Sequence, residues 1–251
     1  VSRRHTLCLS SLGLPGVDAS ALEAPLTEEV IWNTIKTMQP DKAPGPDGFT
    51  MRFYQSCWSI IKEVVMKAVR AFDGADGRGM ERLNEAFIVL LPKKEGALDI
   101  KDFRPISLVH NFAKIVAKAM SAELAPLVPK LVDQNQSAFI AGRSILDNFM
   151  LVQSTARRLH VLKQPAIMLK LDISKAFDSD QWPFLVEVMR CMGFSTKWID
   201  WICGLLATSS TRIMVNGVLG EPIYNCQGLR QGDHVSPMLF ILTMEPLQKM
   251  L

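Results

Sequence analysis

Segments with helical periodicity alternate along this chain with short β-prone runs that tight turns connect. Glu85–Leu91 and Phe103–Val109 flank the turn Pro92–Gly96, and Arg212–Val215 precedes Asn216-Gly217, the favoured pair for a type I′ hairpin. Strands joined by hairpins pair antiparallel, whereas a doubly wound fold needs helices between parallel strands. The pattern therefore predicts an α+β fold with an antiparallel sheet packed on helices.

The remaining elements are predicted from apolar spacing, helix caps and turn residues. Ile167–Ile173 is predicted to be a buried strand with a carboxylate at its end, and the second hairpin is predicted to return as a strand from Val218 to Tyr224. Gln227–Val235 is predicted to be a loop. The expected helices are Thr27–Met38, Met51–Phe72, Asn111–Leu124, Ser144–Leu162, Pro183–Met192, Ser195–Leu206 and a final apolar helix from Ser236.

The composition suits a folded chain in a reducing compartment. Of 251 residues, 48% are apolar and 21% charged, which excludes a disordered chain because a core can be filled. Five cysteines without a C-x-x-C pair indicate neither a disulfide framework nor a zinc site. Arg3–His5 and the interrupted stretch Thr6–Leu14 are rejected as a signal peptide, and no apolar run could span a bilayer. We expect an intracellular protein, nuclear or cytoplasmic, without a membrane partner.

The charge is unevenly distributed. The net charge is only +3, from 28 basic and 25 acidic residues. Residues 1–50 hold 4 basic and 6 acidic groups, residues 51–170 hold 18 and 11, and residues 171–251 hold 6 and 8, so the middle carries +7 between flanks of −2. The middle could attract a polyanion and the acidic C-terminal part could hold divalent cations, although an ordinary solvated surface explains the charge equally well.

Three segments could carry chemistry. Leu169–Asp178 places Asp172 at the end of a strand, where a carboxylate and turn carbonyls can hold a hard cation, although an aspartate that caps the next helix is the commoner case. Gly228–Pro237 is a glycine-containing loop that could lie beneath a nucleotide or simply link a hairpin to a helix. Lysine and arginine near the tip of the first hairpin could close over a triphosphate, or could be solvated.

Considered together, five blocks resemble the successive motifs of a reverse transcriptase from the non-LTR (LINE-like) retrotransposon branch. Their amino-acid sequences are similar to those of plant lineages. The resemblance covers nearly the whole chain from Thr27 to Leu251. Several specific motifs in the right order make chance a poor explanation of the similarity. The blocks are Lys42–Gly48, Phe103–Leu108, Ala138–Arg143, Leu171–Asp178 and Gly228–Pro237.

This resemblance implies a right-hand polymerase: an RNA-directed DNA polymerase that uses Mg²⁺ or Mn²⁺ and dNTPs to extend a DNA primer on an RNA template. We expect an N-terminal flank (1–26), a fingers-like subdomain with interleaved palm elements (27–166) and a partial palm (167–251), without a thumb. The first residue is Val1, so we expect a fragment of a longer protein. Oligomeric state is not predicted.

The resemblance also implies roles for single residues. Asp172 would be the catalytic metal carboxylate with the Ile173 carbonyl beside it, and Phe177 the aromatic gate that excludes a 2′-hydroxyl. Asp172 and Gln231 should meet in one cleft. The triphosphate and the nucleotide would contact Lys93, Lys94, Arg104, Lys175, Ala176, Gln231 and Gly232, and the template would contact Gly142, Arg143 and Arg230.

The sequence departs from the family pattern in ways that bear on activity. No Asp-Asp pair occurs in it, although the family's third palm block supplies one. Asp180 stands where the family usually has an apolar residue, and His234-Val235 stands in place of Pro-Leu. We therefore expect no detectable primer extension, and the alternatives are a catalytically inactive retroelement remnant that binds RNA and a non-enzymatic interaction domain. We also expect the strand Ile167–Ile173 and the final helix to leave an unpaired edge and an exposed apolar face.

Overall fold

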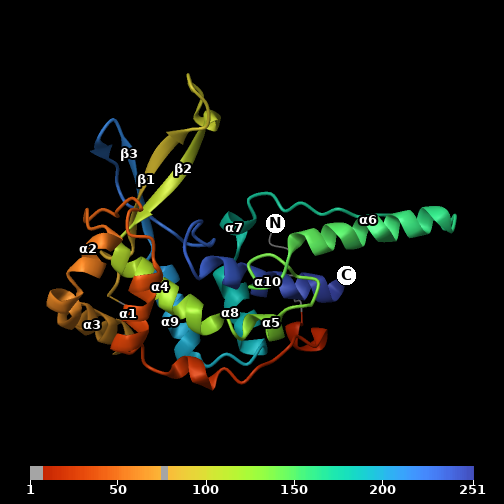
Figure 1. Cartoon of the computed structure of the whole chain (residues 1–251), viewed down its shortest axis with the longest axis horizontal. Helices are drawn as coiled ribbons and strands as arrows, with labels where there is room; N and C mark the ends of the chain where they lie inside the picture. Colours follow the sequence, from red (N-terminus) through yellow and green to blue (C-terminus); the bar gives the residue numbers. More distant parts are fainter. Residues whose placement is uncertain (1–7, 75–78) are drawn as a thin grey trace.

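A computed structural model describes residues 8–74 and 79–251 of the chain (Figure 1). The rejected signal-peptide segment and the 1–26 flank therefore fall partly outside the described residues. Two 3₁₀ turns, η1 (Leu9–Leu12) and η2 (Ser20–Glu23), precede the first six described helices. These helices are α1 (Glu28–Thr37), α2 (Met51–Ser56), α3 (Trp58–Gly74), α4 (Asn111–Leu124), α5 (Val128–Leu131) and α6 (Ile145–Val161).

Five strands form one sheet among the described residues. β1 (Glu85–Pro92) and β2 (Phe103–Val109) make the predicted antiparallel hairpin, in which Leu91 lies opposite Arg104 and the short turn η3 (Ile100–Asp102) precedes β2. β1 also pairs with β3 (Ser210–Val215), and this pair is parallel, with Glu85 opposite Ser210. The sheet is thus mostly antiparallel, as predicted, with one parallel pair that local sequence signals do not indicate.

The second hairpin forms at the predicted turn but its return strand is interrupted. Asn216 (φ 51°) and Gly217 (φ 79°) both have the positive φ that a type I′ turn needs. The return consists of β4 (Val218–Leu219) and β5 (Ile223–Tyr224), each antiparallel to β3. Pro222 stands between them and has no amide hydrogen to donate to a neighbouring strand, which explains the break.

The C-terminal helices confirm the predicted caps. They are α7 (Ala176–Ser179), α8 (Trp182–Cys191), α9 (Thr196–Ala207) and α10 (Ser236–Met250). Pro183 lies in the first turn of α8, and the Ser195 hydroxyl accepts a hydrogen bond from the Trp198 amide at the start of α9. In the N-terminal half, Thr27 caps α1 in the same way.

One predicted helix is two. The range Met51–Phe72 divides at Cys57, whose φ of −100° and ψ of 8° end α2 before α3 begins at Trp58. The change of direction lets the Trp58 ring stack on Trp32 of α1, with centroids 5.2 Å apart. A tertiary contact therefore overrides the continuous helical spacing.

The final helix is packed rather than exposed. α10 contacts α8, α5 and η1, and it buries Leu239, Ile241 and Leu242. The prediction that its apolar face would be open to solvent is wrong, because the N-terminal turns and α8 cover it. These helices share a core with α1, α3 and α4 that includes Trp198, Trp201 and Ile115.

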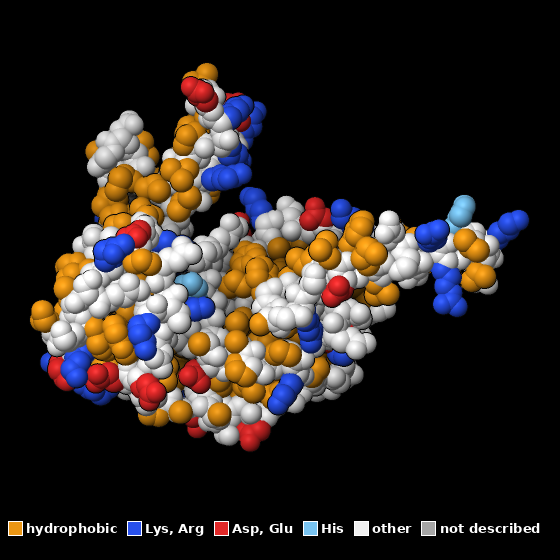
Figure 2. All heavy atoms as spheres, viewed as in Figure 1, with side chains coloured by type: hydrophobic (Ala, Val, Ile, Leu, Met, Phe, Trp, Pro, Cys, Tyr) orange, Lys and Arg blue, Asp and Glu red, His pale blue; other side chains and the backbone are white. Residues whose placement is uncertain are grey.

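The segment from α6 to Lys175, residues 145–175, is here called the arm. It projects from the body in Figure 1, and apolar side chains lie along its surface in Figure 2. Ile167–Ile173 has no strand assignment, and the Ile167 side chain is 99% exposed. The predicted buried strand is therefore wrong: no described strand lies beside this segment to take up its backbone hydrogen bonds. The expected unpaired, exposed apolar segment is present here, without strand geometry.

Candidate nucleotide-binding site

Two segments about fifty residues apart are joined by backbone hydrogen bonds. The Leu229 amide donates to the Phe177 carbonyl oxygen (2.7 Å), and the Gly228 amide donates to the Asp180 carbonyl oxygen (2.7 Å). The Trp182 indole Nε1 in turn donates to the Gly228 carbonyl oxygen (2.7 Å). The end of the block around Asp178 and the start of the block around Gln231 therefore lie side by side.

Gly228 is required by this contact. Its φ is +83°, and a Cβ atom placed there would lie 2.9 Å from the Asp178 carbonyl oxygen and 3.1 Å from that of Phe177. An L-residue would thus combine an unfavourable backbone conformation with a backbone clash. The absence of a side chain is what lets the two segments approach each other.

A cleft opens between this junction and the base of the β1–β2 hairpin, and it is here called the nucleotide cleft. It has a volume of about 560 Å³, which lies in the range of small-molecule sites. The loop supplies Gln227–Gly232, the junction supplies Asp178, and the strands contribute apolar and hydroxyl groups. Its lining from the strands consists of Ile88, Pro105, Ile106, Ser107 and Thr211.

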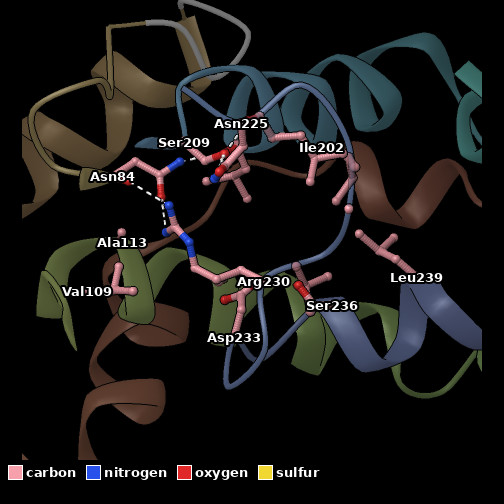
Figure 3. Close-up of a pocket in the computed structure, with 15 residues that line it drawn as sticks. Asn84, Val109, Ala113, Ile202, Ser209, Asn225, Arg230, Asp233, Ser236 and Leu239 are labelled. Atoms are coloured by element: carbon pink, nitrogen blue, oxygen red, sulfur yellow. Dashed lines mark hydrogen bonds between the residues drawn. The ribbon is translucent and has the colours of Figure 1, made fainter. Parts of the chain in front are cut away.

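Arg230 points into the interior and not toward a template. Its Nη1 donates to Asn84 Oδ1 (2.8 Å) and its Nη2 donates to the Asn84 carbonyl oxygen (2.9 Å), as Figure 3 shows. Asn84 Nδ2 completes the network by donating to the Leu205 carbonyl oxygen (2.6 Å). Burial lowers the pKa of the Arg230 guanidinium. Arg230 thus holds the loop to the base of β1, and a template contact by Arg230 stays a prediction.

The same interior region contains Asp233, which organises the start of α10. Its Oδ1 accepts a hydrogen bond from the His234 amide (2.8 Å), and its Oδ2 accepts one from the Ser236 hydroxyl (3.1 Å). Loss of water raises the pKa of Asp233, and these hydrogen bonds and the Arg230 charge oppose the rise. A small cavity of about 40 Å³ lies beside these groups, lined also by Ser209 and Asn225.

Phe177 belongs to an aromatic cluster. Its ring stacks on Phe240 of α10 at 4.7 Å and meets the edge of Phe139 at 6.5 Å. The cluster packs α7 against α10 and fixes the direction of the ring. The role of Phe177 as an aromatic gate remains a prediction.

Asp172 and Ile173 lie in the arm. Asp172 is exposed and is not among the residues that line the nucleotide cleft, whereas Gln231 is. Ile173 borders a different hollow with Asp180, Phe240 and Thr243. Within residues 8–74 and 79–251, no three His, Cys, Asp or Glu side chains gather as a metal site, so the groups do not fit a metal ion as they lie. Lys175 (φ +50°) and Ala176 connect the arm to α7.

The cations of the hairpin lie near its tip. Lys93 Nζ donates to the Lys101 carbonyl oxygen (2.7 Å), and Lys94 Nζ lies 3.1 Å from Asp102 Oδ1. Arg104 is exposed on β2. Figure 2 shows charged side chains of both signs at this projecting end, away from the body. Closure over a triphosphate would require the hairpin to bend.

Arg143 is engaged within its own loop. Its Nη1 donates to the carbonyl oxygens of Asp133 and Gln136 (both 2.7 Å), and its Nη2 donates to that of Pro129 (3.2 Å). The guanidinium therefore holds the loop before α6 together, and a template contact by Arg143 stays a prediction. Gly142 (φ +80°) provides the turn that allows this, and it is exposed.

Sequence reasoning missed residues that the fold brings to this region. Nothing in the sequence around Asn84 marks it, because its role depends on Arg230 lying 146 positions later. Lys114 and Lys118 did carry a signal: they are four residues apart, which places both on one face of a helix.

Two further properties concern membrane-spanning helices and cysteines. Among the described residues, no helix combines the length and the apolar character that crossing a bilayer requires. All five cysteines are free thiols.

Comparisons with known proteins identify relatives of this chain. Residues 91–251 match the family described as "Reverse transcriptase (RNA-dependent DNA polymerase)". The chain is 30% identical over 244 residues to the "Transposon TX1 uncharacterized 149 kDa protein" of Xenopus laevis, covering 93% of this chain and 18% of that protein. It is 28% identical over 213 residues to the "Retrovirus-related Pol polyprotein from type-1 retrotransposable element R2" of Nasonia vitripennis, covering 83% of this chain and 20% of that protein.

A solved structure is similar over most of the chain. The "Partial Cas6-RT-Cas1--Cas2 complex" aligns over 90% of this chain and 33% of that chain, with 17% identity and a TM-score of 0.49. The chain spans about a fifth of the length of the curated relatives it matches.

Proposed function

The chain belongs to the reverse transcriptase family, and from that premise we propose that it forms the fingers and the nucleotide-binding part of the palm of an RNA-directed DNA polymerase. The polymerase joins a dNTP to the 3′-hydroxyl of a DNA primer paired with an RNA template. The fingers comprise residues 27–166 and the palm residues 167–251, and β1 joins the two by its parallel pairing with β3. The family match does not favour the alternatives of an RNA-binding remnant and of an interaction domain.

The observation that carries this proposal is the junction of Phe177–Asp180 with Gly228–Leu229. The backbone and polar groups of this junction line one side of the nucleotide cleft. The base of the β1–β2 hairpin forms the other side. Gln231 offers both a donor and an acceptor to a nucleotide, and Gly232 lets the backbone approach it closely. In this family, we infer that such an arrangement binds a dNTP that is base-paired with the template.

The cationic hairpin and α7 complete the proposed nucleotide contacts. Lys93, Lys94 and Arg104 approach the triphosphate when the hairpin bends, and the backbone amides of Lys175 and Ala176, just before the junction in the sequence, bind it as well. Phe177 excludes the 2′-hydroxyl once its ring leaves the Phe240 stack. Gly142, Arg143 and Arg230 are the proposed template contacts, and the two guanidinium groups have to leave their partners inside the protein to reach the template.

A divalent cation, Mg²⁺ or Mn²⁺, belongs to this proposal as the family's cofactor, with Asp172 and the Ile173 carbonyl as ligands. The arm would have to dock for these groups to reach the nucleotide cleft. We therefore derive no chemical step through the metal, and we expect primer extension by this chain to stay below detection.

Two finer assignments rest on the sequence. The residues in the motif blocks favour a LINE-like element of a plant lineage. The five free thiols favour an intracellular compartment, nuclear or cytoplasmic.

Template-directed nucleotide binding tests the proposal. The 251-residue chain is mixed with an RNA template and a DNA primer that ends in a dideoxynucleotide, and complexes are resolved by gel retardation with each dNTP in turn. We expect the complementary dNTP to stabilise the complex, and Gln231→Ala to weaken this effect by a factor of about 2–12, the equivalent of one hydrogen bond. Gln153→Ala, an exposed change in α6, is the matched control.

Equal stabilisation by all four dNTPs, or an unchanged effect in Gln231→Ala, would overturn the nucleotide site. A primer with a free 3′-hydroxyl tests the expected lack of extension. Robust extension that disappears in Asp172→Ala would contradict only the expected lack of extension. It would mean that the arm docks onto the body and brings Asp172 to the nucleotide cleft.

A further inference from the structure

A second hollow adjoins the nucleotide cleft and is lined by basic side chains to which the family resemblance assigns no role. It is here called the lysine groove, defined by Lys42, Lys114, Lys118 and His234. It shares Ile106, Ser107 and Gly232 with the nucleotide cleft, so the two hollows meet at the end of β2 and the Gly232 turn. The remaining lining includes polar Thr37, Gln39 and Asn111.

The block Lys42–Gly48 builds one wall of the groove by close backbone contact. A Cβ atom on Gly45 would clash with the Val109 carbonyl oxygen and would lie 2.5 Å from His110 Cα. Asp47 Oδ2 lies 3.0 Å from His110 Nδ1, and Asn111 Nδ2 donates to the Phe49 carbonyl oxygen (2.5 Å). This loop is therefore held against the start of α4, which brings Lys42 beside the helix face of Lys114 and Lys118.

The positive charges of the groove lack acidic partners. Among the described residues, Lys42, Lys114 and Lys118 make no ion pair, and the Lys114 ammonium has only a long contact of 3.5 Å to the Ala43 carbonyl oxygen. The nearby carboxylates are already occupied: Asp47 faces His110, and Asp233 accepts from the His234 amide and the Ser236 hydroxyl.

The lysines also act on each other and on His234. Burial lowers the pKa of Lys114, and the Lys42 charge lowers it further while Asp47 opposes this. Burial lowers the pKa of His234, and the charges of Lys118, Lys42 and Lys114 add to the effect while Asp233 opposes it. The groove is thus a concentrated positive field that an anion would relieve.

We propose that the lysine groove binds the backbone phosphates of the single-stranded template that continues beyond the nucleotide cleft. This inference rests on the proposed function, because it takes the strand paired with the dNTP to leave the nucleotide cleft across the Ser107–Gly232 border that the two hollows share. Lys114 and Lys118 lie about 6 Å apart along the helix axis, and Lys42 lies across the groove. Cations spread over two elements suit successive phosphates of a strand better than one free phosphate.

The test compares primer–template duplexes that are blunt with ones that carry a six-nucleotide 5′ template overhang. Fluorescence anisotropy measures their affinity for the 251-residue chain between 50 and 200 mM KCl. We expect the overhang to tighten binding by about tenfold, and the variant Lys42→Gln/Lys114→Gln/Lys118→Gln to lose this gain. Three lost phosphate contacts should lower the slope of log K against log salt by about 2.

A matched variant controls for the loss of charge alone. Lys67→Gln/Arg70→Gln/Lys130→Gln removes the same charge from exposed positions elsewhere and should keep both the overhang preference and the slope. Lys42→Gln alone guards against a folding defect, since Lys42 is exposed in a loop, and it should lose about a third of the slope change.

Three results would overturn the proposal: no overhang preference in the wild-type chain, an equal preference in the triple groove variant, or displacement of the overhang contribution by inorganic phosphate at millimolar concentration. The last result would identify a site for free phosphate. The preference for the complementary dNTP is measured in parallel. If the groove proposal fails while this preference is observed, the proposed function is still supported.

Discussion

The strand β1 and the segment Ile167–Ile173 have similar local sequences and different structures. Both are short apolar runs with β-prone residues, and each precedes a turn. β1 lies between β2 and β3: it pairs with β2 along most of its length and with β3 over residues 85–88, so the backbone of its first half has neighbours on two sides. The segment in the arm has no neighbouring strand among the described residues and is exposed along its length. A strand is therefore defined by its partners as much as by its own residues.

This difference extends to the regions that contain the two segments. The body buries large side chains from helices that are far apart in sequence, whereas α6 buries none. α6 is held at its start, where the Ser144 hydroxyl accepts from the Leu146 amide (3.2 Å) and Asn148 Nδ2 donates to the Asn135 carbonyl oxygen (2.7 Å). Capping and charge placement stabilise this helix, and packing contributes little.

The same substitution in the two regions gives the sharpest contrast. Leu185→Ala removes a fully buried side chain in α8 and should lower the free energy of unfolding by about 2–5 kcal/mol, because it loses apolar burial and leaves a cavity. Leu169→Ala in the arm, where the side chain is 71% exposed, should change it by less than about 0.5 kcal/mol. Chemical denaturation of both variants measures this. A large loss in Leu169→Ala would show that the arm packs against the body.

The junction where the arm rejoins the body should be sensitive to a single methyl group. Gly228→Ala introduces a Cβ atom 2.9 Å from the Asp178 carbonyl oxygen, and Gly232→Ala introduces one with open space around it. Both positions have positive φ, which costs about 1–2 kcal/mol for an L-residue. Gly228→Ala should therefore destabilise the protein by the larger amount, roughly 1–3 kcal/mol beyond Gly232→Ala. Thermal melts compare the two variants, and equal melting would mean that the junction is open in solution.

Asp180, at the same junction, should make stability depend on pH. Thr243 Oγ1 lies 2.7 Å from Asp180 Oδ2 and 2.8 Å from the Phe240 carbonyl oxygen, and its one proton cannot serve both. Burial raises the pKa of Asp180 above its ordinary 3.8. A protonated Asp180 donates to Thr243 Oγ1 and leaves the Thr243 proton for the Phe240 carbonyl oxygen, while Asp180 Oδ1 stays buried without a partner among the described residues. Since the unfolded chain releases this proton first, the free energy of unfolding should fall as pH rises from about 4 to the raised folded pKa.

Asp180→Asn keeps a donor toward Thr243 at every pH. We expect this variant to reduce the fall in the free energy of unfolding with rising pH, and to raise that free energy at pH 7 by about 1 kcal/mol. Asp178→Asn, two residues away and exposed, should leave the profile unchanged. Thermal melts from pH 4 to 8 compare the three proteins, and a steeper decrease in Asp180→Asn would refute a protonated Asp180.

Local determinants made much of the fold predictable. The Thr27, Ser144 and Ser195 caps, the Asn216-Gly217 turn and the first hairpin all depend on residues within a few positions of one another. The break at Cys57 and the parallel pairing of β1 with β3 depend on distant packing, so periodicity does not reveal them. The interruption at Pro222 has a local cause, the missing amide hydrogen, that the predicted return strand did not take into account.

The candidate site divides in the same way. Motif order identified the blocks around Asp178 and Gln231, and these blocks do meet in the structure. The direction in which a long side chain points was not predictable: Arg143 and Arg230 lie in motif blocks and bond to backbone and amide groups inside the protein. A motif thus locates a loop more reliably than it assigns the contacts of each of its residues.

The parallel pairing of β1 with β3 has a consequence for synthesis on the ribosome. Glu85 pairs with Ser210, and its carboxylate lies 2.9 Å from Arg212 Nε, so both contacts await a segment made about 125 residues later. The hairpin can close on itself early, but one side of β1 stays uncovered while the intervening chain is translated. During that interval the nascent protein carries an open sheet edge, which makes the speed of elongation and the presence of chaperones part of how this molecule reaches its native state.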